Sequence, residues 1–90
     1  MEQDLITLYG RPGCELCEST EAIVRTLIAD EGSRLSLSVV NIEEDPATHA
    51  RLLAQIPALE VAGQFLPLAL SRMQIAAHFR SAVGADDGER

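Results

Sequence analysis

Aromatic side chains are scarce in this 90-residue sequence, which contains one Tyr, two Phe and no Trp. Apolar residues nevertheless make up 47% of the chain. A chain of this length forms one domain, so we expect a single core built from Leu, Ile, Val and Ala. We place this domain at residues 1–84 and predict a flexible tail over residues 85–90, where the sequence has no packing pattern.

Basic residues are also few, and lysine is absent. Seven Arg stand against 14 Asp and Glu, which gives a formal net charge of −7. The sequence has no cluster of basic residues that would form a binding surface for nucleic acid, and an acidic surface repels anionic membranes. We therefore expect no nucleic acid and no membrane among the partners, and we interpret the charge as a feature that keeps a small domain soluble.

Long apolar runs are missing as well. The first apolar run spans five residues, Leu5–Tyr9, and follows an acidic start, so it is neither a signal peptide nor a membrane span. We expect a cytoplasmic protein. Its two cysteines, Cys14 and Cys17, are too few for the disulfide framework of a secreted scaffold. In a reducing compartment, such a pair indicates a catalytic or metal-binding site.

The apolar pattern predicts strands that alternate with helices. A β-rich run at residues 5–9 ends in the loop Gly10-Arg11-Pro12-Gly13, and from Leu16 to a stop at Gly32 apolar residues recur at helical spacing. Further strands are expected at residues 35–42, 58–61 and 64–66. Further helices are expected at residues 46–54, with Asp45 as N-cap, and from residue 72, with Ser71 as N-cap.

The resulting order β-α-β-α-β-β-α restricts the topology. The first two strands are joined by a helix, so they should lie parallel with a right-handed crossover. The last two strands flank Ala62-Gly63 and should form an antiparallel hairpin. The sequence therefore predicts an α/β domain with a mixed sheet and helices on both faces.

Cys14 stands where the Gly-rich loop meets the first helix. At a helix start, unpaired backbone N–H groups and about half a unit of positive charge favour an anion, and the thiolate is the form of cysteine that attacks a disulfide. A spacing of three places Cys17 one turn further on nearly the same side, so the two sulfurs can meet. We predict Cys14 as the exposed nucleophile and the more covered Cys17 as the resolving cysteine.

Charged neighbours act on the Cys14 thiol in opposite directions. Arg11 favours the thiolate, whereas Glu15 and Glu18 oppose it. Cys-X-X-Cys motifs lower the thiol pKa from about 8.5 to values of roughly 3.5 to 7.5. Here we expect a moderate lowering, which is typical of a reductant rather than of a strong oxidant.

Two segments resemble the glutaredoxins and the small glutaredoxin-like proteins of bacteria: Leu8-Tyr9-Gly10-Arg11-Pro12-Gly13-Cys14-Glu15-Leu16-Cys17, and Ile56-Pro57 ahead of a strand that ends in Val61-Ala62-Gly63. The resemblance extends over about residues 4–83. It implies a thioredoxin-like fold of glutaredoxin type in three layers, with a four-stranded mixed sheet in the order 2-1-3-4. It also implies a cis peptide bond before Pro57, which in this family lies against the cysteine pair, and a free backbone at Ile56 that pairs with an extended substrate.

The family's glutathione contacts are matched in part. Arg11 corresponds to the basic residue that helps to hold glutathione ahead of the motif. Glu15-Leu16 replaces the usual Pro-Tyr, and Pro67-Leu68-Ala69-Leu70-Ser71 replaces the usual Gly-Gly turn and acidic pair. The start of the last helix, with Ser71 and Arg72, can receive a carboxylate; alternatively, Ser71 is only a helix cap and Arg72 a solvated side chain.

The motif and the resemblance predict an enzyme, a thiol–disulfide oxidoreductase that reduces protein disulfides or glutathione mixed disulfides. We expect a monomer without a bound cofactor or metal, with glutathione as a candidate electron donor. Two alternatives stay open: a carrier of soft metals such as Cu(I) or Zn that uses the same cysteines, and a partner-binding module without turnover. Glu60 either faces the cysteines and accepts a proton from Cys17 or lies exposed on its strand.

Overall fold

The computed structural model describes residues 4–31 and 35–87, and within them the elements follow the predicted order β-α-β-α-β-β-α. The strands are β1 (Asp4–Gly10), β2 (Leu35–Asn41), β3 (Ala58–Val61) and β4 (Gln64–Leu66), and the helices are α1 (Glu15–Glu31), α2 (Pro46–Leu52) and α3 (Arg72–Asp87). Two short 3-10 helices, η1 (Ile42–Glu44) and η2 (Leu53–Gln55), flank α2. The predicted helix stop at Gly32 lies outside the described residues.

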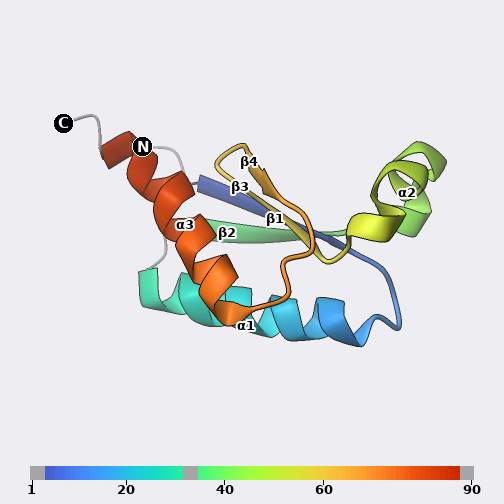
Figure 1. Ribbon diagram of the computed structural model, residues 1–90, viewed down its shortest axis with the longest axis horizontal. Helices are drawn as coiled ribbons and strands as arrows, with labels where there is room; N and C mark the ends of the chain where they lie inside the picture. Colours follow the sequence, from blue (N-terminus) through green and yellow to red (C-terminus); the bar gives the residue numbers. More distant parts are fainter. Residues whose placement is uncertain (1–3, 32–34, 88–90) are drawn as a thin grey trace.

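The four strands form one mixed sheet in the order β2-β1-β3-β4, as the resemblance implied (Figure 1). Strand β1 pairs in parallel with β2, so that Ile6 lies beside Leu37, and pairs antiparallel with β3, so that Ile6 lies beside Val61. Strands β3 and β4 form the predicted antiparallel hairpin. The parallel pair ends at Gly10, and this end of the sheet leads into the loop that carries Cys14.

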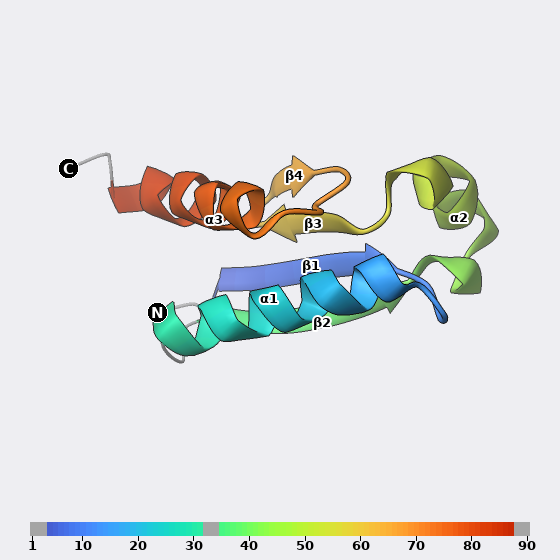
Figure 2. The same ribbon diagram turned by 60° about the horizontal axis from the view of Figure 1, so that its bottom comes forward.

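One face of the sheet carries the core, and we call it the covered face. It is formed by alternate residues of the two central strands, Ile6 and Leu8 of β1 and Leu59 and Val61 of β3, all of them at most 1% exposed. Val24 of α1 and Ile75 and Phe79 of α3 complete the same buried cluster. Helices α1 and α3 therefore lie together on this face of the sheet (Figure 2).

The opposite face, which we call the open face, presents Leu5, Thr7 and Tyr9 of β1, Glu60 of β3 and Phe65 of β4. Leu5 is 56% exposed and Phe65 is 40% exposed. Helix α2 lies beyond the end of the sheet and not on this face (Figures 1 and 2). The prediction of helices on both faces is therefore corrected.

The position of α2 follows from its length and its connections. Its seven residues span only about 10 Å, and η1 joins it directly to the end of β2. Its one buried residue, Leu52, and Ile42 of η1 are both shielded from solvent but lie outside the main core cluster. The helix is thus held at the end of the strands and does not reach across the sheet.

Both predicted N-caps are present. The Asp45 carboxylate accepts hydrogen bonds from the Thr48 side chain and backbone N–H, which lower the pKa of Asp45. The Ser71 hydroxyl accepts from the Gln74 N–H at 3.0 Å. The Gln74 side chain reaches back to the Leu70 N–H, one residue before the N-cap itself.

The last helix is longer than expected. Helix α3 continues to Asp87, so residues 85–87 are helical, and the flexible tail from residue 85 stays a prediction. A single glycine such as Gly84 costs a helix only about 1 kcal/mol and does not by itself end it. Residues 88–90 lie outside the described part of the chain. Within the described residues, no helix has both the length and the apolar character needed to span a membrane.

Candidate active site at the start of helix α1

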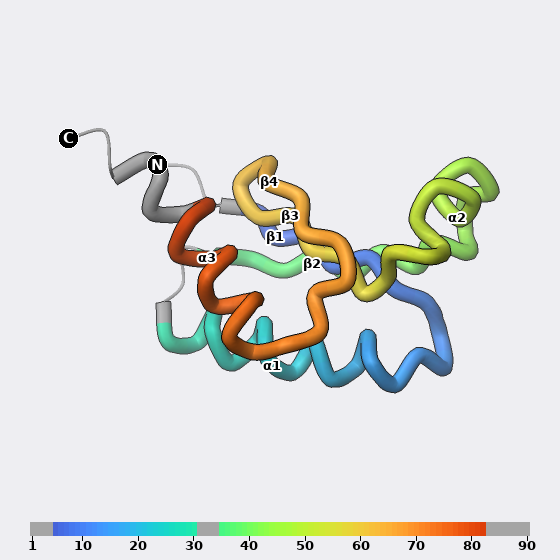
Figure 3. The backbone as a smooth tube through the Cα atoms, viewed as in Figure 1, coloured from blue at the N-terminus to red at the C-terminus, as the bar shows by residue number. Residues whose placement is uncertain are grey.

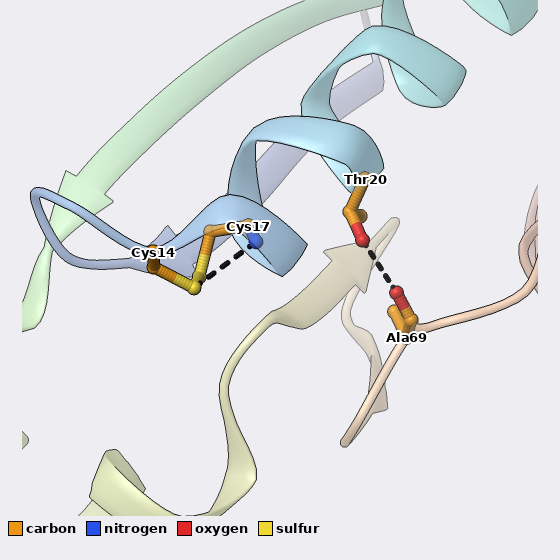
Figure 4. The surroundings of a disulfide bond; sticks show 4 residues. All are labelled: Cys14, Cys17, Thr20 and Ala69. Atoms are coloured by element: carbon orange, nitrogen blue, oxygen red, sulfur yellow. Dashed lines mark hydrogen bonds between the residues drawn. A yellow bond between two sulfur atoms is a disulfide. The ribbon is translucent and has the colours of Figure 1, made fainter.

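The two cysteines meet at the N-terminal end of helix α1. Cys14 is the last residue of the loop and Cys17 lies in the first turn of the helix, and their sulfurs are joined in a disulfide bond (Figure 4). Their Cα atoms are 5.2 Å apart. The prediction that a spacing of three brings the two sulfurs together is confirmed.

The Cys14 side chain takes the place of a helix cap. The Cys17 N–H donates to Cys14 Sγ over 3.0 Å, and the Glu18 N–H donates to the Cys14 carbonyl oxygen over 3.1 Å. An N-cap side chain normally satisfies one of the unpaired N–H groups in this way. Here the acceptor is sulfur, so a negative charge on Cys14 would lie against a backbone donor at the positive end of the helix dipole.

The two sulfurs differ in their access to solvent. Cys14 is partly exposed, whereas Cys17 is 7% exposed. Cys17 lies beneath the first turn of α1, against the end of β1, where a Cβ atom on Gly10 would lie only 3.0 Å from Cys17 Sγ. A partner can therefore reach Cys14 from solvent more easily than Cys17, as the predicted roles require.

The peptide bond between Ile56 and Pro57 is cis, as the resemblance implied. Pro57 is buried and Ile56 is half-buried. The Pro57 carbonyl accepts a hydrogen bond from the Ala69 N–H over 2.7 Å, and the Gln55 carbonyl accepts from the Leu68 N–H over 2.9 Å. The proline loop is therefore held by the segment that connects β4 to α3.

The same connecting segment is attached to helix α1. After β4 it turns back toward α1 before α3 begins (Figure 3). The buried Thr20 hydroxyl, one turn beyond Cys17, donates to the Ala69 carbonyl over 2.6 Å (Figure 4). Thr20 is the one polar side chain on the apolar face of this helix that is almost completely buried, at 1% exposed, among the residues that the structure describes. Together with the Ala69–Pro57 hydrogen bond, it links the cysteine helix, the connecting segment and the proline loop.

Leu68 in this segment has an unusual backbone conformation. Its φ of 51° is in the left-handed region, which is unfavourable for a residue with a Cβ atom. The Leu68 side chain is 45% exposed, and Leu70 and Met73, which follow in the chain, are exposed as well. Within the cysteine motif, Leu16 is also exposed. Four apolar side chains are thus presented to solvent on the motif, on the connecting segment and on the first turn of α3.

Arg11 lies at a different place from the other predicted glutathione contacts. It lines a pocket of about 230 Å³ between the first turns of α1 and the end of β2, together with Cys17, Glu18 and Asn41. Ser71 and Arg72 are exposed at the start of α3, and the Ser71 hydroxyl already serves as a cap. Contacts of these residues with glutathione stay predictions.

Glu60 does not face the cysteines. It lies on the open face between Leu59 and Val61, both of which point to the covered face where Cys17 lies. Its carboxylate accepts a hydrogen bond from the Tyr9 hydroxyl over 3.1 Å. Partial burial, followed by the hydrogen bond and charge of Glu60, raises the pKa of Tyr9. Glu60 is therefore a partner of Tyr9 and not a proton acceptor for Cys17.

Sequence reasoning missed two residues of this site. Thr20 lies on the apolar face that predicts α1, where a threonine often marks a buried hydrogen bond. Gly10 was assigned to a loop, although a glycine at the end of a strand often marks a close approach of other atoms. Both signals are visible in the sequence but do not by themselves identify the contacting atoms.

Residues 5–80 match the family described as Glutaredoxin-like domain (DUF836). The chain belongs to this family. The matched residues include both cysteines, the cis proline and most of α3. The similarity is therefore not limited to the two sequence segments that resemble the glutaredoxins. No curated protein gives a significant match.

Two solved structures are similar to this glutaredoxin-like domain. Protein Ne2328 from Nitrosomonas europaea, determined in solution by NMR, is 28% identical with a TM-score of 0.67, over 87% of this chain and 93% of that one. A mutant thioredoxin from Halobacterium salinarum NRC-1 is 16% identical with a TM-score of 0.62, over 90% of this chain and 75% of that one. At this low identity, the second similarity supports the thioredoxin fold alone.

Proposed function

We propose that the protein is a thiol–disulfide oxidoreductase that cycles between the Cys14–Cys17 disulfide and the two free thiols. One observation carries the proposal: a partly exposed sulfur caps the first turn of α1, and a second, covered sulfur lies within bonding reach of it. This arrangement supplies both a stabilised thiolate for attack and an internal thiol for release.

The cycle is balanced in atoms and electrons. The Cys14 thiolate attacks one sulfur of a partner disulfide, and the other partner sulfur leaves as a thiolate that takes a proton from water. The Cys17 thiol then gives up its proton, and its sulfur attacks Cys14 Sγ. The Cys14–Cys17 bond forms, and the second partner sulfur leaves and is protonated. Two electrons pass from the cysteine pair to the partner, and a thiol donor returns them.

The surroundings of the pair support a protein disulfide as the preferred substrate. Leu16, Leu68, Leu70 and Met73 are exposed apolar side chains, and apolar side chains suit a segment of a protein better than the charged tripeptide glutathione. The Ser71 hydroxyl, proposed as part of a carboxylate site, is already bonded to the Gln74 N–H. Mixed disulfides with glutathione are the second substrate class, and glutathione is the proposed electron donor.

Two cysteine variants test the function. With insulin and with a glutathionylated peptide as substrates, Cys14→Ser should lower the rate of disulfide reduction by at least about a hundredfold, because the remaining thiol, Cys17, is almost completely buried. Cys17→Ser should accumulate a mixed disulfide through Cys14, which mass spectrometry of the acid-quenched protein detects. Reduction of both substrates at the wild-type rate by Cys14→Ser would show that the proposal is wrong.

A further inference from the structure

We propose that Gly10 is a positioning residue for the second half of the cycle, in which Cys17 resolves the mixed disulfide on Cys14. This inference rests on the proposed function. Gly10 is buried at the end of β1, directly beneath the first turn of α1. A Cβ atom at this position would lie 3.0 Å from Cys17 Sγ and 3.1 Å from Cys17 Cβ. Ordinary van der Waals contacts of a Cβ atom lie between 3.4 and 4 Å.

Position 10 requires a glycine because there is no space for a side chain, and not because the backbone has a conformation that only glycine adopts easily. Gly10 is part of β1 and pairs with Asn41 of β2, and its φ is outside the left-handed region that favours glycine. Gly63 in the β3–β4 turn is the opposite case, because its φ is +83° and no atom lies within 4 Å of an added Cβ. A side chain at position 10 is therefore excluded by Cys17 alone.

The contact determines where the Cys17 sulfur can be once the disulfide is open. An added Cβ on Gly10 would meet Cys17 Sγ at 3.0 Å and Cys17 Cβ at 3.1 Å. Gly10 and Cys17 also line the same pocket of about 230 Å³, together with Leu8 and Val39. A methyl group at position 10 would therefore push the thiol by several tenths of an ångström, and the pocket offers room for this movement.

Displacement of this sulfur affects only one of the two chemical steps. Attack by Cys14 on the partner does not involve Cys17 Sγ. Resolution requires the Cys17 thiolate to approach Cys14 Sγ in line with the bond that breaks, and misplacement of a reacting group by about 1 Å costs roughly a hundredfold in rate. For the smaller shift caused by a methyl group, we expect resolution to slow by about tenfold, while the first step is unchanged.

The experiment compares Gly10→Ala with the wild type during reaction of the reduced protein with oxidised glutathione. Acid quenching and mass spectrometry give the fractions of reduced, glutathionylated and internally oxidised protein over time. Gly10→Ala should accumulate the glutathionylated form and convert it to the internal disulfide about ten times more slowly than the wild type. In a Cys17→Ser background, Gly10→Ala should leave the rate of glutathionylation at Cys14 unchanged.

Gly63→Ala serves as the matched control. It also introduces a methyl group, in the β3–β4 turn and at a positive φ where a side chain is strained, so it should lower stability without slowing resolution. Equal resolution rates for Gly10→Ala and the wild type would overturn the inference, as would an equal slowing by Gly63→Ala. Failure of the proposed function is distinguishable, because then Cys14→Ser would not prevent glutathionylation and reduction.

Should Gly10→Ala not fold, a rescue variant decides the question. Replacing Cys17 by Gly in addition removes both atoms that the new methyl group would meet, Sγ at 3.0 Å and Cβ at 3.1 Å. The double variant Gly10→Ala, Cys17→Gly should then regain the circular dichroism spectrum and the cooperative urea unfolding of Cys17→Gly alone. A double variant that also fails to fold would show that Gly10 is required for another reason.

Discussion

The two faces of the sheet differ in the type of side chain they carry and in how far these side chains are exposed to solvent. The covered face consists of aliphatic side chains that are nearly inaccessible to solvent, with Ile6, Leu8 and Leu59 at most 1% exposed. The open face carries a hydrogen-bonded Tyr9–Glu60 pair and a Phe65 ring whose centroid is 6.4 Å from that of Tyr9. Both helices of more than ten residues lie on the covered face.

The difference places both the stabilising core and the cysteine pair on one face of the sheet. Burial of apolar surface is the main favourable term in folding, and most of the buried apolar side chains lie between the covered face, α1 and α3. The cysteine pair lies at the end of this same packed layer, so the position of the sulfurs is determined by the core. The open face contributes little to either, and substitutions there should be tolerated.

The largest expected contrast is between Leu59 and Phe65, which lie on opposite faces of neighbouring strands. Leu59→Ala should lower the free energy of unfolding by about 3 kcal/mol, because it leaves a cavity in the core. Phe65→Ala should lower it by about 1 kcal/mol or less, because the ring is already 40% exposed. Urea denaturation followed by circular dichroism measures both. Equal losses would show that the open face is buried in the protein in solution.

A smaller effect is expected at the junction between α1 and the connecting segment. Thr20→Val keeps the size of the side chain but leaves the Ala69 carbonyl without its 2.6 Å hydrogen bond, at a cost of about 2 kcal/mol. Thr20→Ser keeps the hydroxyl and loses only a methyl group, at about 1 kcal/mol. The same denaturation experiment distinguishes the two. If Thr20→Ser were the less stable variant, packing and not the hydrogen bond would hold the segment.

The smallest expected effect is electrostatic and concerns the open face. The pKa of Tyr9 is raised above its ordinary value of 10.0 by partial burial and then by Glu60. Glu60→Gln should therefore lower the Tyr9 pKa toward 10.0 without reaching it, because burial remains. Absorbance of the tyrosinate in the oxidised protein reports Tyr9 alone, since the chain has one Tyr and no Trp. An unchanged titration would mean that Glu60 does not interact with Tyr9.

The contribution of Tyr9 to the free energy of unfolding depends on pH, because its pKa differs between the folded and the unfolded chain. Tyr9 holds its proton more tightly in the folded than in the unfolded chain, so its contribution is complete below pH 10 and is lost as the pH rises through the folded pKa. Tyr9→Phe should remove this alkaline loss of stability. The wild type and Tyr9→Phe can be compared by urea denaturation at neutral and at alkaline pH.

The elements that local chemistry determines were predictable from the sequence. Asp45 and Ser71 are N-caps because a short acceptor side chain is followed by a helix-forming segment, and the strand-loop-helix around Cys14 is marked by its glycines and by a change of apolar period. The cis bond before Pro57 was not visible in the residues themselves, since most X-Pro bonds are trans. It came from the family resemblance.

Features that depend on three-dimensional packing were not predictable in the same way. The apolar residues of α2 fit a helix, but nothing in them says whether it lies across the sheet or beyond its end. Thr20 and Gly10 depend on atoms of Ala69 and Cys17 in other elements. The sequence shows a polar residue on an apolar helix face and a glycine at the end of a strand. Only the tertiary arrangement identifies the atoms that each of them contacts.

The donor that faces Cys14 Sγ is the backbone N–H of Cys17. A main-chain donor is present whatever side chain stands at that position, with proline as the single exception. The two residues between the cysteines, here Glu15 and Leu16, can therefore be replaced without removing the group that stabilises the sulfur. Substitutions at these two positions would change the surface that a partner meets while the backbone donor at the helix start stays in place.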